Sequence, residues 1–309
     1  MQFTRRKTAD AGLLVLVNAM WAAQYPAYKT ATSRAGPVAI SLWTFLIAAL
    51  VLIPFFLRER QGTAKPAARF DWKGFVLLAL LGLIPGSAIL AWGTALSTAS
   101  NAALLYLTLP VITAVMAVTL LREKMTLVRW GSLLLALAGV LIVSGPDWHH
   151  ADLHSMRFLG GNLVILLAVT GSAFYNVFSK RLLSTYTPLE VLIFGYLIAA
   201  GLSVPLVLWM EPSSVAAMRT YTPGVWASLL VLSVFSWGLA MVLWMHLLKR
   251  LDVSQASVSI YLLPLLGVLF SAVLLKERIT PAMLAGGALT LAGTVLITSA
   301  DTPGVEEGK

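Results

Sequence analysis

The stretch "TLPVITAVMAVTLLREKMT", residues 108–126, returns in similar form as "LLPLLGVLFSAVLLKERIT", residues 262–280. Each copy is an apolar run with one proline near its start, and each ends in a basic-acidic-basic triplet, one apolar residue and a threonine. A long apolar run that reaches charge only at its end is typical of a helix that crosses a membrane. The chain therefore contains a membrane-spanning unit twice.

The similarity extends beyond this stretch. Residues 100–144 and 254–298, aligned at an offset of 154, share 12 identities in 45 positions. The most informative matches pair a proline, an acid and a threonine: Pro110 with Pro264, Glu123 with Glu277, and Thr126 with Thr280. Earlier in the halves an offset of 151 aligns Lys29 with Lys180 and Pro37 with Pro188. These matches indicate an internal duplication.

The composition is that of an integral membrane protein. Of the 309 residues, 59% are hydrophobic and only 11% are charged, whereas a soluble domain carries roughly 25% charged residues. The absence of cysteine excludes disulfides and thiolate metal sites. The basic residues form short clusters between apolar runs, which is typical of loops at a membrane surface and argues against a nucleic-acid partner.

Ten segments are long and apolar enough to cross roughly 30 Å of hydrocarbon. They are residues 11–31, 38–57, 73–93, 99–121, 126–145, 158–181, 187–209, 223–248, 253–275 and 281–299. None alternates with the period of two that a β-barrel wall requires. The predicted fold class is an all-α integral membrane protein with ten transmembrane helices.

The basic residues predict the orientation of these helices. With the N-terminus in the cytoplasm, 16 of the 22 lysines and arginines fall on the cytoplasmic side. We therefore expect a multi-pass protein of the cell inner (plasma) membrane with both termini cytoplasmic.

Each half of the chain holds five predicted spans. Residues 1–147 form the N-terminal repeat and residues 148–309 the C-terminal repeat. Because five is an odd number, the second repeat enters the membrane from the opposite side. The triplet of residues 122–124 then lies inside and its copy at 276–278 outside. Such inverted-topology repeats are typical of secondary transporters that hold their substrate near the bilayer midplane.

The stretches "LPVITAVMAVTLLREKMTLVRWGSLLLALAGVLIV" and "LPLLGVLFSAVLLKERITPAMLAGGALTLAGTVLI" resemble the two domains of the ten-span EamA-type branch of the drug/metabolite transporter superfamily. The resemblance implies a monomeric 5+5 helix bundle, a central cavity lined by helices 1, 3, 4, 6, 8 and 9, and export of amino acids or related metabolites. Aromatic residues near the expected pathway make the chain most similar to bacterial aromatic amino-acid exporters.

Aromatic and polar side chains at membrane depth are candidates for binding substrate, because polar groups there usually face the bundle interior. In the first span Trp21, Tyr25 and Tyr28 share one helical stripe, and Gln24 lies next to it. The candidates in later spans are Trp92, Asn101, Tyr106, Tyr175, Asn176, Trp237, His246 and Tyr261. His246 has two alternative roles: it could couple transport to protons, or it could be a structural group at the end of its span.

Helix breaks in matching spans are the second signal of a transporter site. Pro110 and Pro264 each remove a backbone donor from the middle of a span. In the third span the break is predicted at Pro85 and Gly86, and in the eighth at Gly238. We expect these residues to act in gating.

No acidic residue lies deep in a predicted span, and no cluster of basic residues does. This favours a neutral or zwitterionic solute, and the predicted function is export of aromatic or apolar amino acids by alternating access. The alternative is a broad-specificity drug or metabolite efflux transporter, with or without coupling to protons. The sequence shows no acid–base pair, nucleophile or metal cluster of an enzyme. The expected partners are a small-molecule substrate and the lipid bilayer, with no cofactor and no metal.

Overall fold

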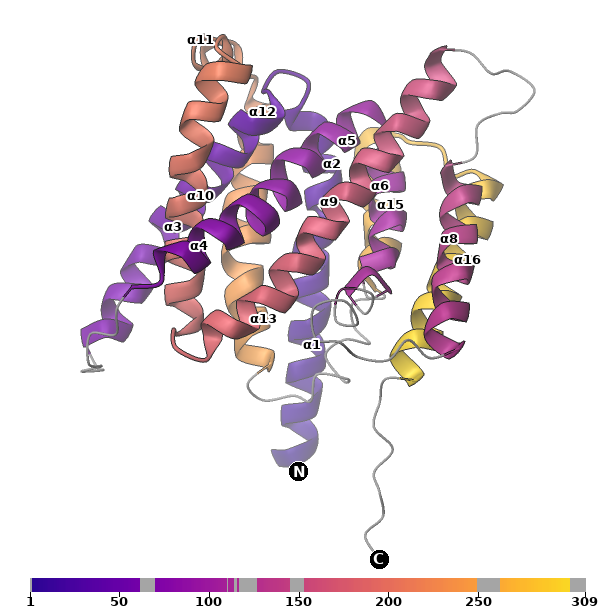
Figure 1. Cartoon of the computed structure of the whole chain (residues 1–309), viewed down its shortest axis with the longest axis horizontal. Helices are drawn as coiled ribbons and strands as arrows, with labels where there is room; N and C mark the ends of the chain where they lie inside the picture. The colour runs from indigo at the N-terminus through magenta and orange to yellow at the C-terminus, as the bar shows by residue number, and fades with distance from the viewer. Residues whose placement is uncertain are drawn as a thin grey trace, which may run out of the picture.

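The computed structural model describes residues 2–61, 70–109, 111–113, 116, 127–144, 153–248 and 262–300 (Figure 1). Within these ranges all regular structure is helical, and no strand is present. The predicted all-α fold class is confirmed.

The first half of the chain contributes five groups of helices. They are α1 (Gln2–Ala22) with α2 (Gln24–Ala31); α3 (Pro37–Gln61); α4 (Trp72–Leu78), which continues through the π-helical segments η1 (Ala79–Leu83) and η2 (Pro85–Ile89) into α5 (Leu90–Leu96); α6 (Ala99–Leu105) with the 3₁₀ turn η3 (Tyr106–Thr108); and α8 (Leu127–Ser144).

The second half repeats this order. Its helices are α9 (Leu153–Leu183); α10 (Pro188–Met210); the short α11 (Ser214–Ala217) and η4 (Met218–Thr220); α12 (Pro223–Leu230), which continues through the π-helical η5 (Val231–Leu239) into α13 (Ala240–Leu248); α15 (Leu262–Leu275); and α16 (Pro281–Ala300).

Five helices among the described residues are long and apolar enough to cross a membrane: Pro37–Arg60, Trp72–Leu96, Met156–Leu183, Pro188–Met210 and Pro223–Trp244. Two shorter apolar helices lie at Leu262–Leu275 and Pro281–Gly293. The observed helix α9 begins five residues before its predicted start at residue 158. Two predicted spans are described only in part. Residues 117–121 of the span 99–121 lie outside the described residues, and so do residues 253–261 of the span 253–275.

Short polar side chains cap several helix starts. Asp71 accepts a hydrogen bond from the Gly74 backbone before α4, and Thr222 accepts one from Val225 before α12. These two caps lie 151 residues apart, which is the offset that aligns the earlier spans of the two halves. Each cap opens a helix that later becomes π-helical, so both the cap and the backbone irregularity are repeated.

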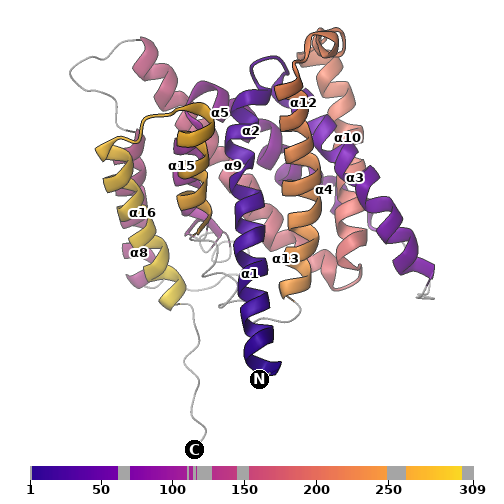
Figure 2. The same ribbon diagram turned by 180° about the vertical axis from the view of Figure 1, so that it is seen from behind.

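Equivalent helices of the two halves pack against each other. Helix α3 lies along α10 on one side of the molecule, and α8 lies along α16 on the other (Figures 1 and 2). The second pair is close, because a Cβ added at Gly139 would lie 2.5 Å from the Gly286 carbonyl oxygen. Small residues that let two backbones approach are typical of helix contacts within membranes.

The chain directions alternate between the two ends of the bundle. In Figure 1, α1 begins and α16 finishes at the lower end, whereas the segment between α15 and α16 crosses the upper end. The Glu277 carboxylate in this segment accepts hydrogen bonds from the first backbone N–H groups of α6. The end of α15 therefore meets the start of α6, and these neighbouring helices run antiparallel.

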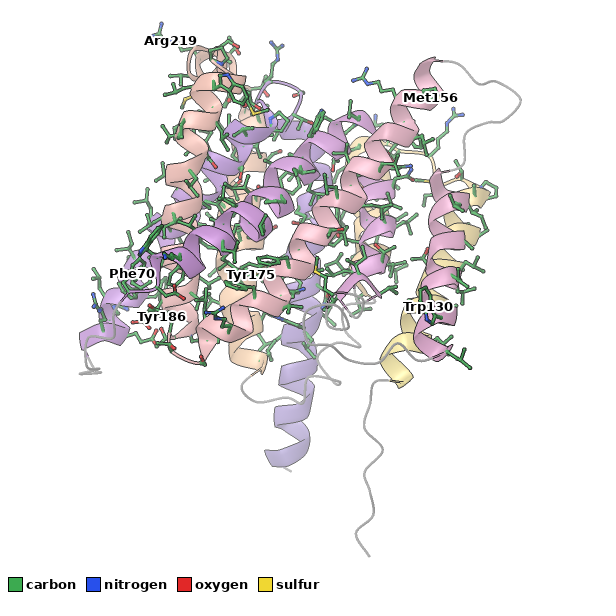
Figure 3. All side chains as sticks on the ribbon, in the orientation of Figure 1. Phe70, Trp130, Met156, Tyr175, Tyr186 and Arg219 are labelled. Atoms are coloured by element: carbon green, nitrogen blue, oxygen red, sulfur yellow. The ribbon has the colours of Figure 1, made fainter. Side chains whose placement is uncertain are left out.

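The outward faces carry large apolar side chains. Trp130 of α8, labelled in Figure 3, is 52% exposed, and Leu208 and Trp209 of α10 are exposed as well. A soluble protein would bury such groups, whereas lipid tails cover them without cost. The polar groups of the membrane-length helices gather inside the bundle, where the candidate site lies.

Candidate functional site

Irregular backbone from four parts of the chain meets inside the bundle. The first helix is interrupted at Ala23, where α1 gives way to α2, since Pro26 has no N–H for the Ala22 carbonyl. The other irregular segments are η2, η3 and η5. π-Helical turns are rare and occur frequently at functional sites. At membrane depth such backbone is tolerated only where protein or cavity water covers it.

A hydrogen-bond chain joins three of these elements. Trp237 of η5 donates from Nε1 to the Tyr28 hydroxyl at 3.1 Å. Tyr28 of α2 donates in turn to Ser87 Oγ of η2 at 3.2 Å. Tyr28 and Ser87 are fully buried. The hydrogen bonds fix the indole edge of Trp237 and the phenol edge of Tyr28 to each other.

A second pair lies beside the first. The hydroxyls of Tyr106 in η3 and Ser172 in α9 are 2.7 Å apart. The Tyr25 ring packs edge-on against Tyr106, with centroids 5.7 Å apart.

Gly86 of η2 lies between the hydrogen-bond chain that contains Trp237 and the pair of hydroxyls that contains Ser172. A Cβ added there would lie 3.1 Å from Ser172 Oγ and 3.7 Å from the Trp237 ring. We call the set Tyr25, Tyr28, Ser87, Tyr106, Ser172 and Trp237 the aromatic layer.

The π-helical segment η5 leaves carbonyl groups that other helices satisfy. Tyr196 of α10 donates to the Trp237 carbonyl at 2.7 Å, and Trp21 of α1 donates to the Ser236 carbonyl at 3.2 Å. The Phe45 ring lies 5.2 Å from the Trp237 ring. Trp21 thus contacts the backbone of η5 next to Trp237. Its own ring packs on the Trp244 ring, with centroids 5.1 Å apart.

Tyr175 extends the layer along α9. It is buried against Gly82 of η1, and Figure 3 shows it on the lower part of α9. Its hydroxyl has no hydrogen-bond partner among the described residues. A buried hydroxyl without a partner is uncommon in proteins and carries a desolvation cost. Gln24 is buried next to Tyr25.

Asn101 belongs to a separate polar group nearer the upper end. Its Nδ2 lies 3.4 Å from Asn162 Oδ1, which also accepts from Ser97 Oγ at 2.6 Å. The Lys29 ammonium group satisfies the carbonyl groups at the end of α5, including that of Thr94 at 2.9 Å. Lysine near the C-terminal end of a helix is stabilising because the unpaired carbonyls concentrate negative charge there.

Besides Asn101, two further predicted site residues lie away from the aromatic layer. The Trp92 side chain is 51% exposed on α5, and Asn176 is exposed on α9. Trp92 precedes Gly93, which faces the α9 backbone, so the helix turns the indole outward.

The predicted helix breaks differ in how far the structure describes them. Pro85 and Gly86 lie in η2 and Gly238 lies in η5, so the backbone is irregular at all three. Pro264 is buried near the start of α15. Pro110 and Tyr261 lie outside the described residues, as does the side chain of His246 in α13. A role in gating stays a prediction for the five helix-break residues, and a role in substrate binding stays one for Tyr261 and His246.

Sequence reasoning missed the small and supporting members of the site. Ser87, Ser172, Tyr196 and Phe45 were not among the candidates. A usable signal existed for the two serines, since Ser87 directly follows Gly86 and Ser172 directly follows Gly171. A hydroxyl next to a glycine at a close helix contact is well placed to bond across it.

The chemistry of the aromatic layer is that of a neutral binding surface. Its residues offer ring faces, phenol and serine hydroxyls and an indole N–H, and none carries a charge at neutral pH. The described residues hold no group of three metal-ligating side chains. Such a surface can stack on an apolar body and exchange hydrogen bonds with polar ends.

Comparison with known proteins adds the family. The sequence pattern of the EamA-like transporter family matches residues 11–145 and again residues 159–299. A probable terminal-alkyne amino-acid exporter of Streptantibioticus cattleyicolor is 28% identical, over 94% of this chain and 96% of that protein. An uncharacterized transporter of Archaeoglobus fulgidus is 25% identical over 93% of this chain, and the uncharacterized transporter YoaV of Bacillus subtilis is 25% identical over 92%.

A solved crystal structure is similar in fold to this chain. It superposes with a TM-score of 0.62 over 95% of this chain and 97% of its own, at 20% sequence identity. The narrower resemblance to exporters of aromatic amino acids stays a prediction. Two family matches that together cover most of the residues, on an all-helical bundle with membrane-length helices, establish that this chain is a membrane transporter and belongs to the EamA-like transporter family.

Proposed function

We propose that this transporter exports neutral amino acids with apolar or aromatic side chains, by alternating access. The observation that supports the proposal most directly is the aromatic layer, an uncharged set of rings and hydroxyls where irregular helices meet. In secondary transporters, broken helices of this kind form the substrate site near the midplane.

Each part of a zwitterionic amino acid has a partner in such a layer. Its apolar side chain can stack on the faces of Tyr25, Tyr106 and Trp237. Its ammonium group is attracted to the same faces, and its carboxylate can accept from hydroxyl groups. Because the solute has no net charge, the site needs no fixed counter-ion.

The relatives support the amino-acid class. The Streptantibioticus cattleyicolor protein carries the name of a probable exporter of terminal-alkyne amino acids, which are small zwitterions with an apolar end. That chemistry fits the layer described above.

A second candidate function is efflux of drugs or other metabolites, coupled to protons. Aromatic faces also bind organic cations, so the aromatic layer could bind a cationic drug as well. Against it, the aromatic layer lacks a carboxylate that could bind a cation and a proton in turn.

Flux through purified protein in liposomes tests the proposal. Labelled phenylalanine, tryptophan, threonine and methionine are offered in turn, alongside a labelled organic cation. We expect phenylalanine or tryptophan to cross and the cation to remain behind. Flux of the cation together with no flux of any amino acid would contradict the proposal.

Substitutions in the aromatic layer test the site. We expect Tyr25→Ala and Tyr106→Ala each to weaken apparent affinity about tenfold or more, since Tyr25 is a buried ring and Tyr106 packs edge-on against it. Trp209→Ala is the control, because Trp209 is 79% exposed on the outer face of α10. Unchanged affinity in both tyrosine variants would place the site elsewhere.

A further inference from the structure

Two glutamates bridge the two family-matched segments at the upper end of the bundle. Glu211, which follows α10, accepts hydrogen bonds from the backbone N–H groups of Val38 and Ala39, both at 2.9 Å. Glu277, which follows α15, accepts from Ala99 N at 3.0 Å and from Ser100 N at 2.9 Å. Its carboxylate also accepts from Ser100 Oγ at 2.6 Å.

These contacts satisfy donors that every helix leaves unpaired. The first N–H groups of a helix have no partner within it, and usually a residue just before the helix accepts from them. Thr98 does so for the Asn101 N–H of α6. The first two N–H groups of α3 and of α6, however, donate to the other segment, 172 to 178 residues along the chain. Hydrogen bonds to an ionised carboxylate are roughly twice as strong as neutral ones.

The surroundings of Glu211 fit this contact. A side chain at Gly36 would collide with the Glu211 carboxylate, so the glycine leaves the space that the carboxylate occupies. Ser214 Oγ lies 3.3 Å from the same carboxylate and can donate to it. Burial and the nearby Glu211 carboxylate raise the pKa of Tyr221. The carboxylate is thus enclosed by groups of both segments.

The approach of Glu277 depends on the turn that precedes it. Lys276 adopts a φ of 57°, the left-handed conformation, as the chain leaves α15. The lysine is exposed and Glu277 is partly buried. The turn directs the glutamate toward the start of α6 and leaves the lysine outward.

We propose that Glu211 and Glu277 are the closing contacts of the upper end of the transporter. The inference rests on the proposed alternating-access function, in which each end of the pathway opens in turn. Opening the upper end separates the two segments, and it then exposes four helix N–H groups and two carboxylates at once. The caps therefore stabilise the closed arrangement of that end over the open one.

Thiol accessibility tests the proposal without any substrate. The chain has no cysteine, so Ser172→Cys places a single thiol in the aromatic layer. A membrane-impermeant thiol reagent is applied to proteoliposomes from one side at a time. We expect Glu277→Gln to speed labelling about tenfold from the side of the upper end, because the new amide N–H opposes the helix donors.

The matched control is Glu190→Gln. Glu190 caps the start of α10 through a capping box with Thr187 of the same segment, where the Thr187 N–H donates to it at 2.7 Å. Its substitution makes the same change from carboxylate to amide at a helix cap within one segment, where the amide oxygen can still accept from Thr187 N, and it does not touch the contact between segments. We expect it to leave the labelling rate unchanged from either side.

A milder variant covers the case in which Glu277→Gln does not fold. Ser100→Ala removes only the hydroxyl contact to Glu277, and we expect it to speed labelling about threefold from the same side. Equal rates in Ser100→Ala, Glu277→Gln and Glu190→Gln would overturn the proposal. So would equal acceleration from both sides, since that indicates a loosened protein.

The substrate assay separates this proposal from the proposed function. If the labelling rates behave as expected while no amino acid crosses the membrane, the substrate class is wrong and the closing contacts stand. If amino acids cross and labelling is the same in every variant, the closing contacts are wrong and the substrate class stands.

Discussion

At the scale of single residues, the aromatic layer works through side chains that carry both a ring and a hydrogen-bonding edge. Trp237 uses its indole N–H for Tyr28 and its backbone carbonyl for Tyr196, so one residue ties α2 and α10 to η5. Its ring lies near Gly86. Such a residue is held in one orientation, which a selective binding surface needs.

Trp237→Phe isolates the role of the indole N–H. The variant keeps a ring and loses the donor to the Tyr28 hydroxyl. We expect apparent affinity for phenylalanine to fall about fivefold, in line with the loss of roughly 1 kcal/mol for one buried hydrogen bond. Flux at graded substrate concentration measures it. Trp209→Phe, on the exposed outer face of α10, should behave as the parent, and an equal loss there would contradict the assignment.

The residue scale also shows where sequence reasoning succeeds. Tyr25 and Tyr28 were predicted from their shared helical stripe, and both are fully buried in the layer. Trp92 was predicted from residue type alone and is half exposed. The difference is physical. Spacing reports which face of a helix a residue occupies, whereas residue type does not distinguish an inward from a lipid-facing tryptophan.

At the scale of elements, the π-helical segments are the distinctive feature. A π turn widens the helix and offsets its backbone pairing, so nearby carbonyls become available to side chains. In η5 the carbonyls of Ser236 and Trp237 accept from Trp21 and Tyr196. These contacts stabilise an irregular backbone inside the bundle.

Tyr196→Phe tests this stabilisation. The variant removes the donor to the Trp237 carbonyl and leaves that group unpaired in a buried place, which costs about 1–3 kcal/mol. We expect a lower Tm in detergent. Tyr221→Phe is the matched control, because the buried Tyr221 hydroxyl has no hydrogen-bond partner within the described ranges. An equal fall in both variants would contradict the role given to Tyr196.

The contact between α8 and α16 depends on Gly139. A Cβ there would lie 2.5 Å from the Gly286 carbonyl oxygen and 2.6 Å from the Thr290 nitrogen, both of them backbone atoms. We expect Gly139→Ala to push the helices apart and destabilise the protein by about 1–3 kcal/mol. Thermal unfolding measures this loss.

Gly131 provides the control within the same helix. A Cβ at Gly131 has nothing within 4 Å, so Gly131→Ala gains helix propensity without a collision. We expect its Tm to stay the same or rise slightly. A fall as large as that of Gly139→Ala would show that the close approach is not the cause.

Sequence reasoning placed helices well and irregular backbone only in part. The predicted span 223–248 has the bounds of α12, η5 and α13 together, because turn residues and charge mark both ends. Its nine-residue π segment was indicated only by Gly238. Apolar periodicity predicts that a segment is helical, but π pairing depends on partners such as Tyr196, which comes from a distant part of the chain.

At the scale of the whole molecule, the duplication is the organising feature. The family pattern matches the chain twice, and the equivalent helices α3 and α10, and α8 and α16, pack on each other. This arrangement supports the proposal that residues 1–147 and 148–309 are inverted repeats. An axis in the membrane plane brings equivalent helices together in antiparallel pairs, and their sequence similarity alone does not reveal which pairs touch.

Labelling of single cysteines tests the inverted arrangement. Lys124 and Arg278 hold equivalent positions at the offset of 154. The proposed odd number of spans in each repeat predicts that they lie on opposite sides of the membrane. Lys124→Cys and Arg278→Cys leave both neighbouring glutamates intact, and the parent chain has no thiol.

In sealed vesicles of known orientation, we expect an impermeant thiol reagent to label one position from outside and the other only after permeabilisation. By the distribution of basic residues, residue 278 should be the one that faces out. The proposed exchange of conformations between inverted repeats requires that they enter the membrane from opposite sides. Labelling of both positions from the same side would therefore contradict the inverted arrangement and the exchange between inverted repeats, whatever the substrate proves to be.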